Sequence, residues 1–516
     1  MRTLAFFSSD QSVLISNFDV LQSGHFTKRR IESVSTPVST VAKSDVARPK
    51  ASAIFRGLIT VLAAALIWFS PTPAGVEQKP WHLLAIFFGT IIGLILQPVP
   101  MGAVVLIGTT AAMLTNTLTL SEALAGYMNG TVWLIVAAFL FARAFSKTGL
   151  GRRVAYSFIR AFGNRTLRLA YALALTDLVL APGIPSGAAR TGGVLYPIVK
   201  SLASTYGSEP GPTASRIGTF LILSAYQVHA VTCAMFLTSM VANPLIAELT
   251  QKTVHIQITW SGWAIAALVP GLLSFLAMPY LVFRLTKPQI HETPEAAALA
   301  SAELAKMGPM TRNEWIVFGV FIMVFVLWVT GSRTGLDPTV VALFGLCVML
   351  ILGALKWEDV LAERAGWDAL VWFGGLVGMA AMLGTLGLIP WFSKFVAGHV
   401  AGWPWLPALG ILALVYMYSH YFFASLAAHV TAFFVPFLTV AVAAGAPPYF
   451  AALTFAFFSS LCVSLTHYGG GPSPVYWGSG YADIRQWCTV GFVASVLFVV
   501  VWMGIAPFWW RALGLF

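Results

Sequence analysis

The chain has 516 residues, of which 58% are hydrophobic and only 9% are charged. Soluble domains carry about 25% charged residues, so this composition excludes a soluble protein. Apolar runs of the ~17–25 residues that a bilayer-crossing helix needs follow one another along most of the chain. Such runs are too long for the strands of a membrane β-barrel. The composition therefore predicts an all-α polytopic membrane protein.

The net charge is +11, from 30 Lys and Arg against 19 Asp and Glu. Seven basic residues and no acidic residue lie between Arg143 and Arg168. Basic residues beside membrane spans favour the cytoplasmic side, so we expect this face in the cytoplasm. The excess charge thus indicates membrane orientation rather than a nucleic-acid partner. We expect a multi-pass protein of the cell (inner) membrane with a cytoplasmic N-terminus.

The four cysteines are Cys233, Cys347, Cys462 and Cys488. They lie in apolar surroundings and show no CxxC spacing. We therefore expect small buried thiols, and neither a disulfide framework nor a metal site.

In chain order, residues 1–54 are predicted to be a disordered basic tail, because no long apolar stretch precedes a cleavage site. Residues 55–285 form a first half of apolar spans. Residues 286–312 form a polar segment, predicted to be a cytosolic amphipathic linker helix. Residues 313–516 form the second half. About eleven crossings are expected in total.

Each half holds two irregular features. Residues 129–163 contain two arms that look short for two full crossings, which predicts a re-entrant hairpin. Residues 167–203 are apolar but interrupted by Pro and Gly, which predicts a broken helix. In the second half, the same features are expected as a hairpin at 366–398 and a broken helix at 405–442.

The two halves echo each other at offsets of 237 to 239 residues. Ser186 corresponds to Ser425, for example, and Gly149 to Gly387. A broken helix leaves backbone N–H and C=O groups that hydrocarbon cannot satisfy, so these groups must line a protein or water cavity. Free N–H groups at a helix start favour an anion. Repeats with interrupted helices at matching positions therefore indicate a transporter site, and an odd number of crossings lets the halves be inverted.

The first candidate segment, residues 182–193, holds two prolines and four glycines. No regular helix tolerates this composition. Its hydroxyls and its guanidinium, a planar fork of donors, suit a carboxylate ligand. The alternative is a tight kink whose hydroxyls cap a helix. Asp177 either has a functional role of its own or pairs with Arg190. The candidate binding residues here are Ser186, Gly187, Ala188, Arg190 and Thr191.

Two further segments complete the candidate site. In residues 423–431, His429 falls on the position of Arg190 under the repeat, although a single buried histidine is more often a core residue. In residues 465–474, three consecutive glycines indicate exposed backbone. The candidate binding residues in these segments are Ser425, Leu426, Ala427, His429, Thr431, Thr466, His467 and Gly469.

At these segments the sequence resembles the divalent anion:sodium symporter family, and within it the citrate/succinate and 2-oxoglutarate/malate exchangers. The resemblance is carried by Ala189-Arg190-Thr191-Gly192-Gly193 and by residues 181–186, 196–197, 234–238, 242–245, 423–425, 429–432 and 466–472. It extends over about residues 55–516.

The resemblance implies a homodimer of elevator transporters with two inverted repeats, about eleven transmembrane helices and two re-entrant hairpins. In the family, paired Ser-Asn-Thr motifs bind the substrate carboxylates. They correspond here to Ser186-Gly187-Ala188 and Ser425-Leu426-Ala427, where only the serines are retained.

We therefore expect exchange of di- or tricarboxylates: malate, succinate, 2-oxoglutarate, citrate or tartrate. Arg190 and His429 are expected to supply fixed positive charge, which would make the empty carrier costly to move and so favour exchange. The alternatives are Na⁺-coupled symport of the same anions and, less favoured, a sulfate-type carrier. No cofactor is expected, and Na⁺ enters only in the symport alternative.

Two other classes of protein are disfavoured, a channel and a membrane-embedded enzyme. Ser425 and His429 lie one helical turn apart, but no acidic residue stands beside the histidine to orient it. The expected partners are small carboxylate anions, the lipid bilayer and a second copy of the chain.

Overall fold

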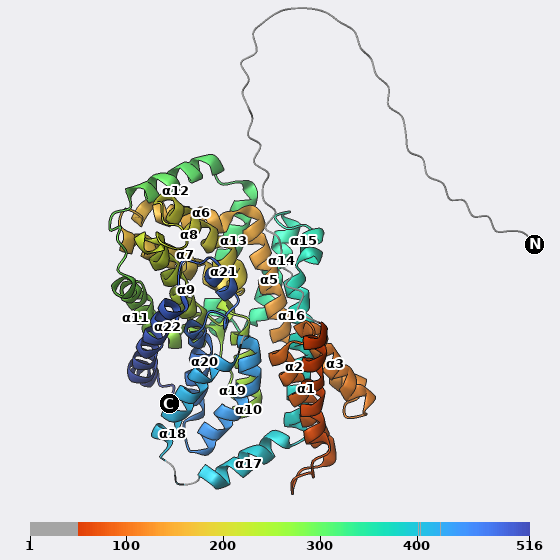
Figure 1. Cartoon of the computed structure of the whole chain (residues 1–516). Helices are drawn as coiled ribbons and strands as arrows, with labels where there is room; N and C mark the ends of the chain where they lie inside the picture. The colour runs from red at the N-terminus through yellow and green to blue at the C-terminus, as the bar shows by residue number, and fades with distance from the viewer. Residues whose placement is uncertain (1–49, 401, 403, 424) are drawn as a thin grey trace, which may run out of the picture. The chain divides into compact units, whose positions relative to one another are not determined.

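The computed structural model describes residues 50–400, 402, 404–423 and 425–516, and the described residues are almost entirely helical (Figure 1). Most of the predicted tail, residues 1–49, lies outside the described residues. The first helix begins at Lys50, so residues 50–54 belong to it rather than to the tail.

The helices of the first half and the linker are α1 (Lys50–Trp68), α2 (Gln78–Leu96), α3 (Met101–Leu114), α4 (Leu120–Leu124), η1 (Ala125–Met128), α5 (Gly130–Thr148), α6 (Leu150–Phe162), α7 (Thr166–Leu180), η2 (Ala181–Gly183), η3 (Ala188–Leu195), α8 (Tyr196–Thr205), η4 (Ala214–Arg216), α9 (Gly218–Met235), η5 (Leu237–Ser239), α10 (Ala242–Val254), α11 (Trp260–Thr286) and α12 (Pro294–Met307).

The helices of the second half are α13 (Arg312–Thr334), α14 (Pro338–Ile351), α15 (Trp357–Ala362), α16 (Arg364–Thr385), α17 (Leu388–Val400), α18 (Trp405–Ser419), η6 (His420–Phe422), α19 (Leu426–Ala443), α20 (Pro448–Leu461), η7 (Cys462–Leu465), α21 (Ser473–Gly478), α22 (Ile484–Val499), η8 (Val500–Ile505) and α23 (Ala506–Ala512).

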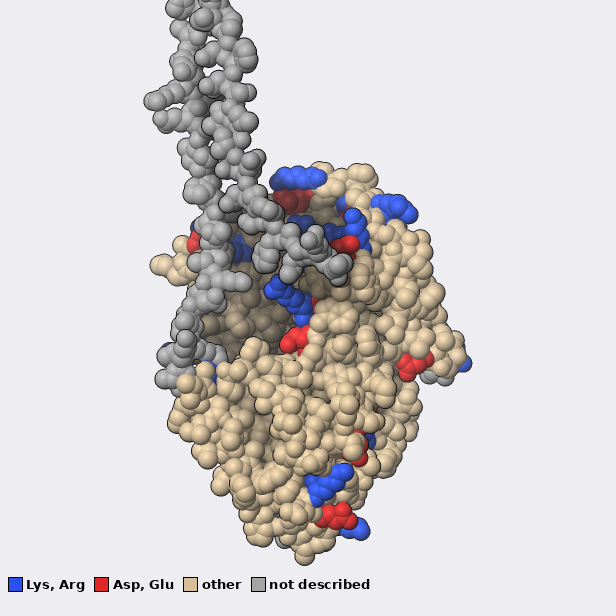
Figure 2. Space-filling view, turned by 90° about the vertical axis from the view of Figure 1, so that its right-hand side faces the viewer, with Lys and Arg blue, Asp and Glu red and all other residues tan. Residues whose placement is uncertain are grey.

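The helices are long and apolar enough for a multi-pass membrane protein. Within the described residues, nine helical stretches reach the length and hydropathy of a membrane span, and three shorter helices are also apolar. Figure 2 shows charged side chains gathered mainly toward the α12 end of one face, above a broad area of uncharged residues. The predicted all-α polytopic class is confirmed.

The helices pack in two groups. One group consists of α1, α2, α3, α5, α13, α14 and α16, which pack side by side. The other is built around α9, which contacts α7, α8, α11 and α20, with α18, α19 and α22 beside them. All the segments singled out from the sequence as candidate binding segments belong to this second group.

The segment predicted as the first broken helix is instead a hairpin. The Thr166 N–H at the start of α7 donates to His291 O at 3.1 Å, and the Tyr206 hydroxyl after α8 accepts from Ala296 N–H at 2.8 Å. Both arms thus return to the segment that leads into α12. Residues 184–187 form the tip between the arms, because the prolines and glycines there reverse the chain rather than interrupt a crossing.

The segment predicted as the second broken helix, 405–442, is also a hairpin. Trp405, at the start of α18, packs edge-on against Phe450 in the first turn of α20, the next helix after α19. Phe450 in turn contacts Phe516 at the end of the chain. Figure 1 places this end of the second group opposite α12. The two hairpins therefore enter from opposite ends, as inverted halves require.

The predicted hairpins at 129–163 and 366–398 are wrong in their second arms. Helix α5 is 19 residues long and does not turn back, because α6 packs along α12 instead, with Arg153 Nη1 donating to Gly308 O at 2.9 Å. In α6, apolar residues such as Ala155 and Ile159 are buried while Arg152 and Arg160 are exposed. This amphipathic pattern suits a helix lying at a surface. Helix α17 likewise packs against α19 rather than along α16.

The helices that break while crossing are α9–α10 and α20–α21. Arg216, just before α9, accepts from Ile290 N–H at the α12 end. Phe450, at the start of α20, lies at the opposite end. The Tyr481 hydroxyl, after α21, donates to Ser208 O, which follows α8 at the α12 end, so α20 and α21 together cross from one end to the other. The first of these breaks contains neither Pro nor Gly, so it gave a weaker sequence signal than the first hairpin tip and the glycine-rich loop.

Candidate functional site

The first hairpin tip ends in a serine-capped helix start. The Ser186 Oγ accepts a hydrogen bond from the Ala189 N–H at 3.2 Å, and Arg190 N–H donates to Ser186 O at 2.8 Å. Ser186 and Gly187 are half-buried and Ala188 is exposed. The first N–H groups of a helix have no partner inside it, so this tip presents free donors.

The second hairpin tip repeats this arrangement 239 residues later. The Ser425 Oγ accepts from Ala428 N–H at 3.5 Å, and His429 N–H donates to Ser425 O at 3.1 Å. Ser425 and Ala427 are half-buried, whereas Leu426 is buried. Equivalent serines therefore cap equivalent helix starts in the two halves.

The glycine-rich loop of the α20–α21 break lies between the two tips. A Cβ on Gly471 would lie 3.3 Å from Ala188 N, and a Cβ on Gly187 would lie 3.3 Å from the Cδ of Pro472. On the other side of the loop, the carbonyl oxygen of Gly469 lies 3.2 Å from His420 Nε2, next to the second tip. The structure thus brings the three candidate segments together.

The Arg190 guanidinium does not face the space between the tips. It is 0% exposed, and its Nε donates to Asp177 Oδ1 at 2.9 Å. Its Nη1 donates to Ile184 O at 2.6 Å and to Ser239 O at 2.9 Å. The expectation that Arg190 offers an uncompensated charge to substrate is therefore wrong. Its charge is balanced by Asp177, and it holds the backbone of the first tip and of the α9–α10 break.

The Asp177 carboxylate is the centre of a buried polar network. It accepts from the Thr191 hydroxyl at 3.0 Å and from the Thr232 hydroxyl. His229 Nδ1 lies 2.7 Å from Thr191 Oγ1 and 3.2 Å from Arg190 Nη2. Of the two readings left open for Asp177, pairing with Arg190 is the one observed. Thr191 belongs to this network rather than to an exposed binding surface.

His429 is enclosed by aromatic rings. Its Nε2 lies 3.1 Å from Tyr416 O, and its ring contacts those of Tyr416, Phe423 and Phe433. It is 0% exposed, so it too offers no charge at the surface of the tip. Under the 239-residue offset, Tyr416 corresponds to Asp177 as His429 does to Arg190. The two halves keep this pair of neighbours and replace an ion pair by aromatic packing.

The remaining candidates surround the second tip and the loop. Thr431 Oγ1 donates to Ala427 O at 2.7 Å inside α19. Thr466 Oγ1 is buried with no hydrogen-bond partner among the described residues. His467 is half-buried and lies against the Trp477 ring, with centroids 4.5 Å apart. A Cβ on Gly469 would lie 2.5 Å from Thr466 Oγ1, so the close approach here requires glycine.

Several residues that tie the two halves together were not among the predicted binding residues. Asn243 Nδ2 donates to Cys233 O at 2.7 Å and to Phe236 O at 3.0 Å. Its Oδ1 accepts from Ser460 Oγ at 2.9 Å, which links the two broken helices. The Tyr226 hydroxyl reaches Ser473 Oγ at 2.6 Å across the same interface. Polar residues inside otherwise apolar runs were the available signal.

A family model described as the sodium:sulfate symporter transmembrane region matches residues 51–516. The chain belongs to the divalent anion:sodium symporter family. It is 46% identical over 475 residues to "Putative malate transporter YflS" of Bacillus subtilis, which covers 92% of this chain and 99% of that protein. It is also 46% identical to the chloroplastic dicarboxylate transporter 1 of Spinacia oleracea, over 89% of this chain and 81% of that one.

Inner membrane protein YbhI of Escherichia coli is a further relative, 36% identical over 88% of this chain and 97% of its own length. The crystal structure of the Alcanivorax borkumensis YdaH transporter matches with a TM-score of 0.50 and 13% identity, covering 90% of this chain and 98% of that one. This structural likeness concerns the fold alone. The symporter family and these relatives identify the chain as a multi-pass membrane transporter, not an enzyme.

Proposed function

We propose that the chain exchanges dicarboxylates across the membrane, with malate, succinate and 2-oxoglutarate as the first substrates to test and citrate or tartrate after them. The observation that carries the proposal is the Gly469–Pro472 loop, which touches Gly187 and Ala188 at the first serine-capped helix start and His420 just before the second. The names of the relatives, which record malate and dicarboxylate transport, support the same substrate class.

Two helix starts suit a guest with two carboxylates. A helix N-terminus carries about half a positive charge, and its free N–H groups point at a bound anion. Ser186 and Ser425 each add a hydroxyl beside such a start, and both are half-buried. One carboxylate at each tip would therefore be held by backbone donors and one serine hydroxyl.

The exchange mode now rests on the tips rather than on fixed cations, because Asp177 balances Arg190. Where the family motif carries Asn and Thr, this chain has Gly187-Ala188 and Leu426-Ala427. These residues offer no side-chain oxygen, and Na⁺ is a hard cation that needs oxygen ligands. Weakened sodium binding at the tips favours movement of the loaded carrier in both directions.

The test is a counterflow assay on the full chain in proteoliposomes. Tracer malate uptake is measured into vesicles that contain malate and into vesicles that contain none, each with and without an inward Na⁺ gradient. We expect uptake to require internal dicarboxylate and to be insensitive to Na⁺. Gradient-driven uptake into empty vesicles would refute exchange, and failure of unlabelled succinate to compete would refute the substrate class.

Matched variants connect the activity to the tips. We expect Ser186→Ala and Ser425→Ala to raise the KM for malate about tenfold each, the equivalent of losing one hydrogen bond to a charged group. Ser301→Ala, at an exposed position on α12, serves as the control. Unchanged kinetics in both tip variants would exclude the serines as ligands.

Na⁺-coupled symport of the same anions remains the second candidate, favoured by one observation. Three buried oxygens, Gln227 Oε1, Ser464 Oγ and Thr466 Oγ1, have no hydrogen-bond partner among the described residues. Gln227 and Ser464 are joined by a hydrogen bond from Gln227 Nε2 to Ser464 O at 3.1 Å. Unpaired oxygens at a helix break suit a sodium ion. The Na⁺ arm of the counterflow assay decides between the two modes.

We further propose that the chain acts as a homodimer by an elevator mechanism, with the α12 end in the cytoplasm. Exposed arginines at 152, 160, 165 and 168 near that end support the orientation. Labelling of single cysteines from each side of the membrane tests orientation and movement, and the mass of the purified protein in nanodiscs tests the dimer.

A further inference from the structure

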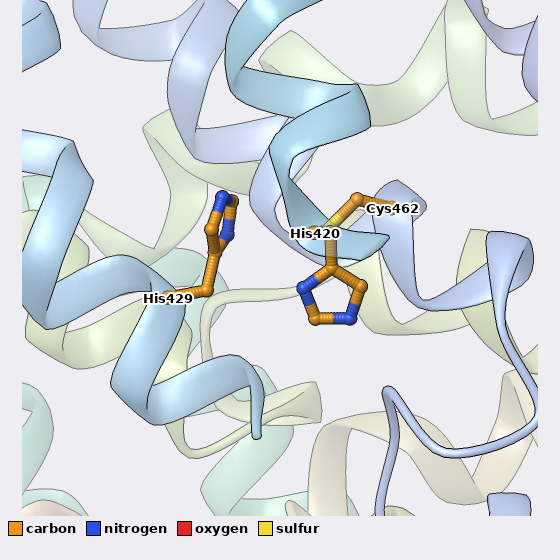
Figure 3. Close-up of side chains that lie close together, drawn as sticks. All are labelled: His420, His429 and Cys462. Atoms are coloured by element: carbon orange, nitrogen blue, oxygen red, sulfur yellow. The ribbon is translucent and has the colours of Figure 1, made fainter. Parts of the chain in front are cut away.

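We propose that His420, His429 and Cys462 form a metal-binding site, with Zn²⁺ as its ion. One candidate ligand atom from each residue lies within 4.8 Å of the other two. All three side chains are 0% exposed. Figure 3 shows that they come from three places in the fold: η6 before the second tip, α19 after it, and the start of η7.

The histidine hydrogen bonds fix which nitrogen is available. His420 Nε2 lies 3.2 Å from Gly469 O, and His429 Nε2 lies 3.1 Å from Tyr416 O. His429 Nε2 also lies 3.0 Å from Ser419 Oγ, whose own hydrogen is donated to Tyr416 O. A carbonyl oxygen only accepts, so both Nε2 atoms carry the proton and both Nδ1 atoms carry a lone pair. Metal-ligating histidines typically donate their other ring N–H to a backbone carbonyl in this way.

Both lone pairs are buried and without a partner. Neither His420 Nδ1 nor His429 Nδ1 has a hydrogen-bond partner within the described part of the chain. In Figure 3 the nitrogen next to the ring attachment of His420 points toward His429. An unpaired buried acceptor is destabilising and rare in native structures, so two such atoms in one cluster indicate a ligand.

Cys462 supplies the third ligand. Its Sγ lies 3.1 Å from Ser459 O, to which the thiol donates. On metal binding the S–H bond is replaced by an S–Zn bond, and the proton leaves to solvent. Two imidazoles and one thiolate match zinc, which bonds nitrogen at about 2.0–2.1 Å and sulfur at about 2.3 Å. The ligand atoms would approach one another by about 1 Å to reach this geometry.

The corresponding place in the first half cannot take a cation. There Arg190 occupies the position equivalent to His429, and it lies 3.4 Å from the sulfur of Cys233. A permanent guanidinium repels a metal ion from that thiol. Around His420 and His429 the neighbours are instead the rings of Tyr416, Phe423 and Phe433. These uncharged neighbours would not repel a metal ion.

A bound ion would cross-link two parts of the second half. His420 and His429 flank the second hairpin tip, whereas Cys462 begins the segment that leads into the glycine-rich loop. Zinc would hold the tip against α20 and leave its fourth position for water or a small anion.

The test uses the purified full chain with its affinity tag removed and its metals stripped by a chelator. Zn²⁺ binding is measured by titration calorimetry and by elemental analysis, and Co²⁺ loading is followed by the thiolate-to-cobalt absorption band. We expect about one Zn²⁺ per chain, a cobalt–thiolate band, and a Tm that rises with Zn²⁺.

Cys462→Ser should abolish the band and weaken Zn²⁺ binding at least tenfold, and His420→Gln should weaken it similarly. Cys233→Ser and Cys488→Ser, which alter thiols outside the cluster, should retain both. Absence of stoichiometric Zn²⁺ in the unmodified chain, or an unchanged cobalt band in Cys462→Ser, would overturn the proposal. A Tm measurement without metal shows whether each variant is folded, and the His420 variant tests the site if the cysteine variant is not.

Discussion

The buried pair of Asp177 and Arg190 gives the sharpest prediction. Replacing Arg190 by Leu removes the permanent cation that pairs with Asp177. Among the described residues, the other ion-pair partner of Asp177 is His229, which is charged only when protonated. The substitution also removes the donors to Ile184 O and Ser239 O. Breaking a buried pair costs about 3–5 kcal/mol. Each carbonyl left unpaired costs about 1–3 kcal/mol, so the sum is about 5 kcal/mol or more.

The paired variants separate charge from hydrogen bonding. We expect Asp177→Asn to cost about 3–5 kcal/mol, because an unpaired guanidinium stays buried. The double variant Asp177→Asn with Arg190→Leu should be less destabilised than the sum of the single variants by about 2 kcal/mol or more, since no lone charge remains. Arg190→Lys should lie between the wild type and Arg190→Leu, because an ammonium lacks the planar fork.

Thermal unfolding of the full chain in nanodiscs, followed by tryptophan fluorescence and size-exclusion chromatography, measures these effects. Arg168→Leu removes an exposed arginine from α7, the helix that carries Asp177, and should change the Tm little. If Arg190→Leu unfolds at the wild-type temperature, or if the double variant equals the sum of the singles, the reasoning fails.

Three further predictions follow from other contacts. Gly187→Ala should destabilise the first tip by about 1–3 kcal/mol, because its Cβ would lie 2.5 Å from Nε2 of the buried His229. Gly193→Ala, whose Cβ would make ordinary contacts, is the control. Equal Tm and malate transport in the two variants would contradict this prediction. Asn243→Leu should lower stability by about 2 kcal/mol, because it removes the hydrogen bonds of Asn243 to two carbonyls and to Ser460, and a wild-type Tm would count against the link between the breaks. Burial raises the pKa of Asp359, but the hydrogen bond and charge of Lys147, together with the Lys356 N–H and the charge of Arg143, outweigh burial, so the pKa lies below its ordinary value. The Lys147–Asp359 pair therefore stabilises the fold above about pH 4, and this effect is lost as the pH falls through the lowered pKa of Asp359. Lys147→Met should cost about 0.5 kcal/mol of stability at pH 7. Tm values measured over a pH series should show this cost vanishing at low pH.

The sequence predicted the helical class, the repeat and the three segments that meet at the site, because prolines, glycines and intramembrane polar residues are local signals. It did not distinguish a hairpin from a broken crossing helix. Both features show an apolar run with an interruption, and only the contacts of Thr166 and Tyr206 with the segment before α12 show that the chain turns back. Tertiary contacts of this kind leave no periodic pattern.

The role of Arg190 shows the same limit at the level of one side chain. A lone intramembrane arginine suggested a ligand for an anion, and Asp177 was visible as a partner 13 residues before it. Whether Arg190 binds an anion or pairs with Asp177 depends on the direction of its guanidinium. The carbonyl oxygens of Ile184, at the first tip, and of Ser239, at the α9–α10 break, set this direction. The cluster of His420, His429 and Cys462 also escaped detection, because its spacing matches no local metal motif.

The replacement of an ion pair by aromatic rings between the halves has a kinetic consequence. In the first half, the Arg190 guanidinium donates directional hydrogen bonds to Ile184 at the tip and to Ser239 of η5, so the first tip resists bending. In the second half, rings around His429 can slide past one another with little loss of contact. A solute arriving from one face of the bilayer thus meets a rigid hairpin tip, and a solute arriving from the other face meets a more flexible one. The rates of entry from the two compartments should therefore differ.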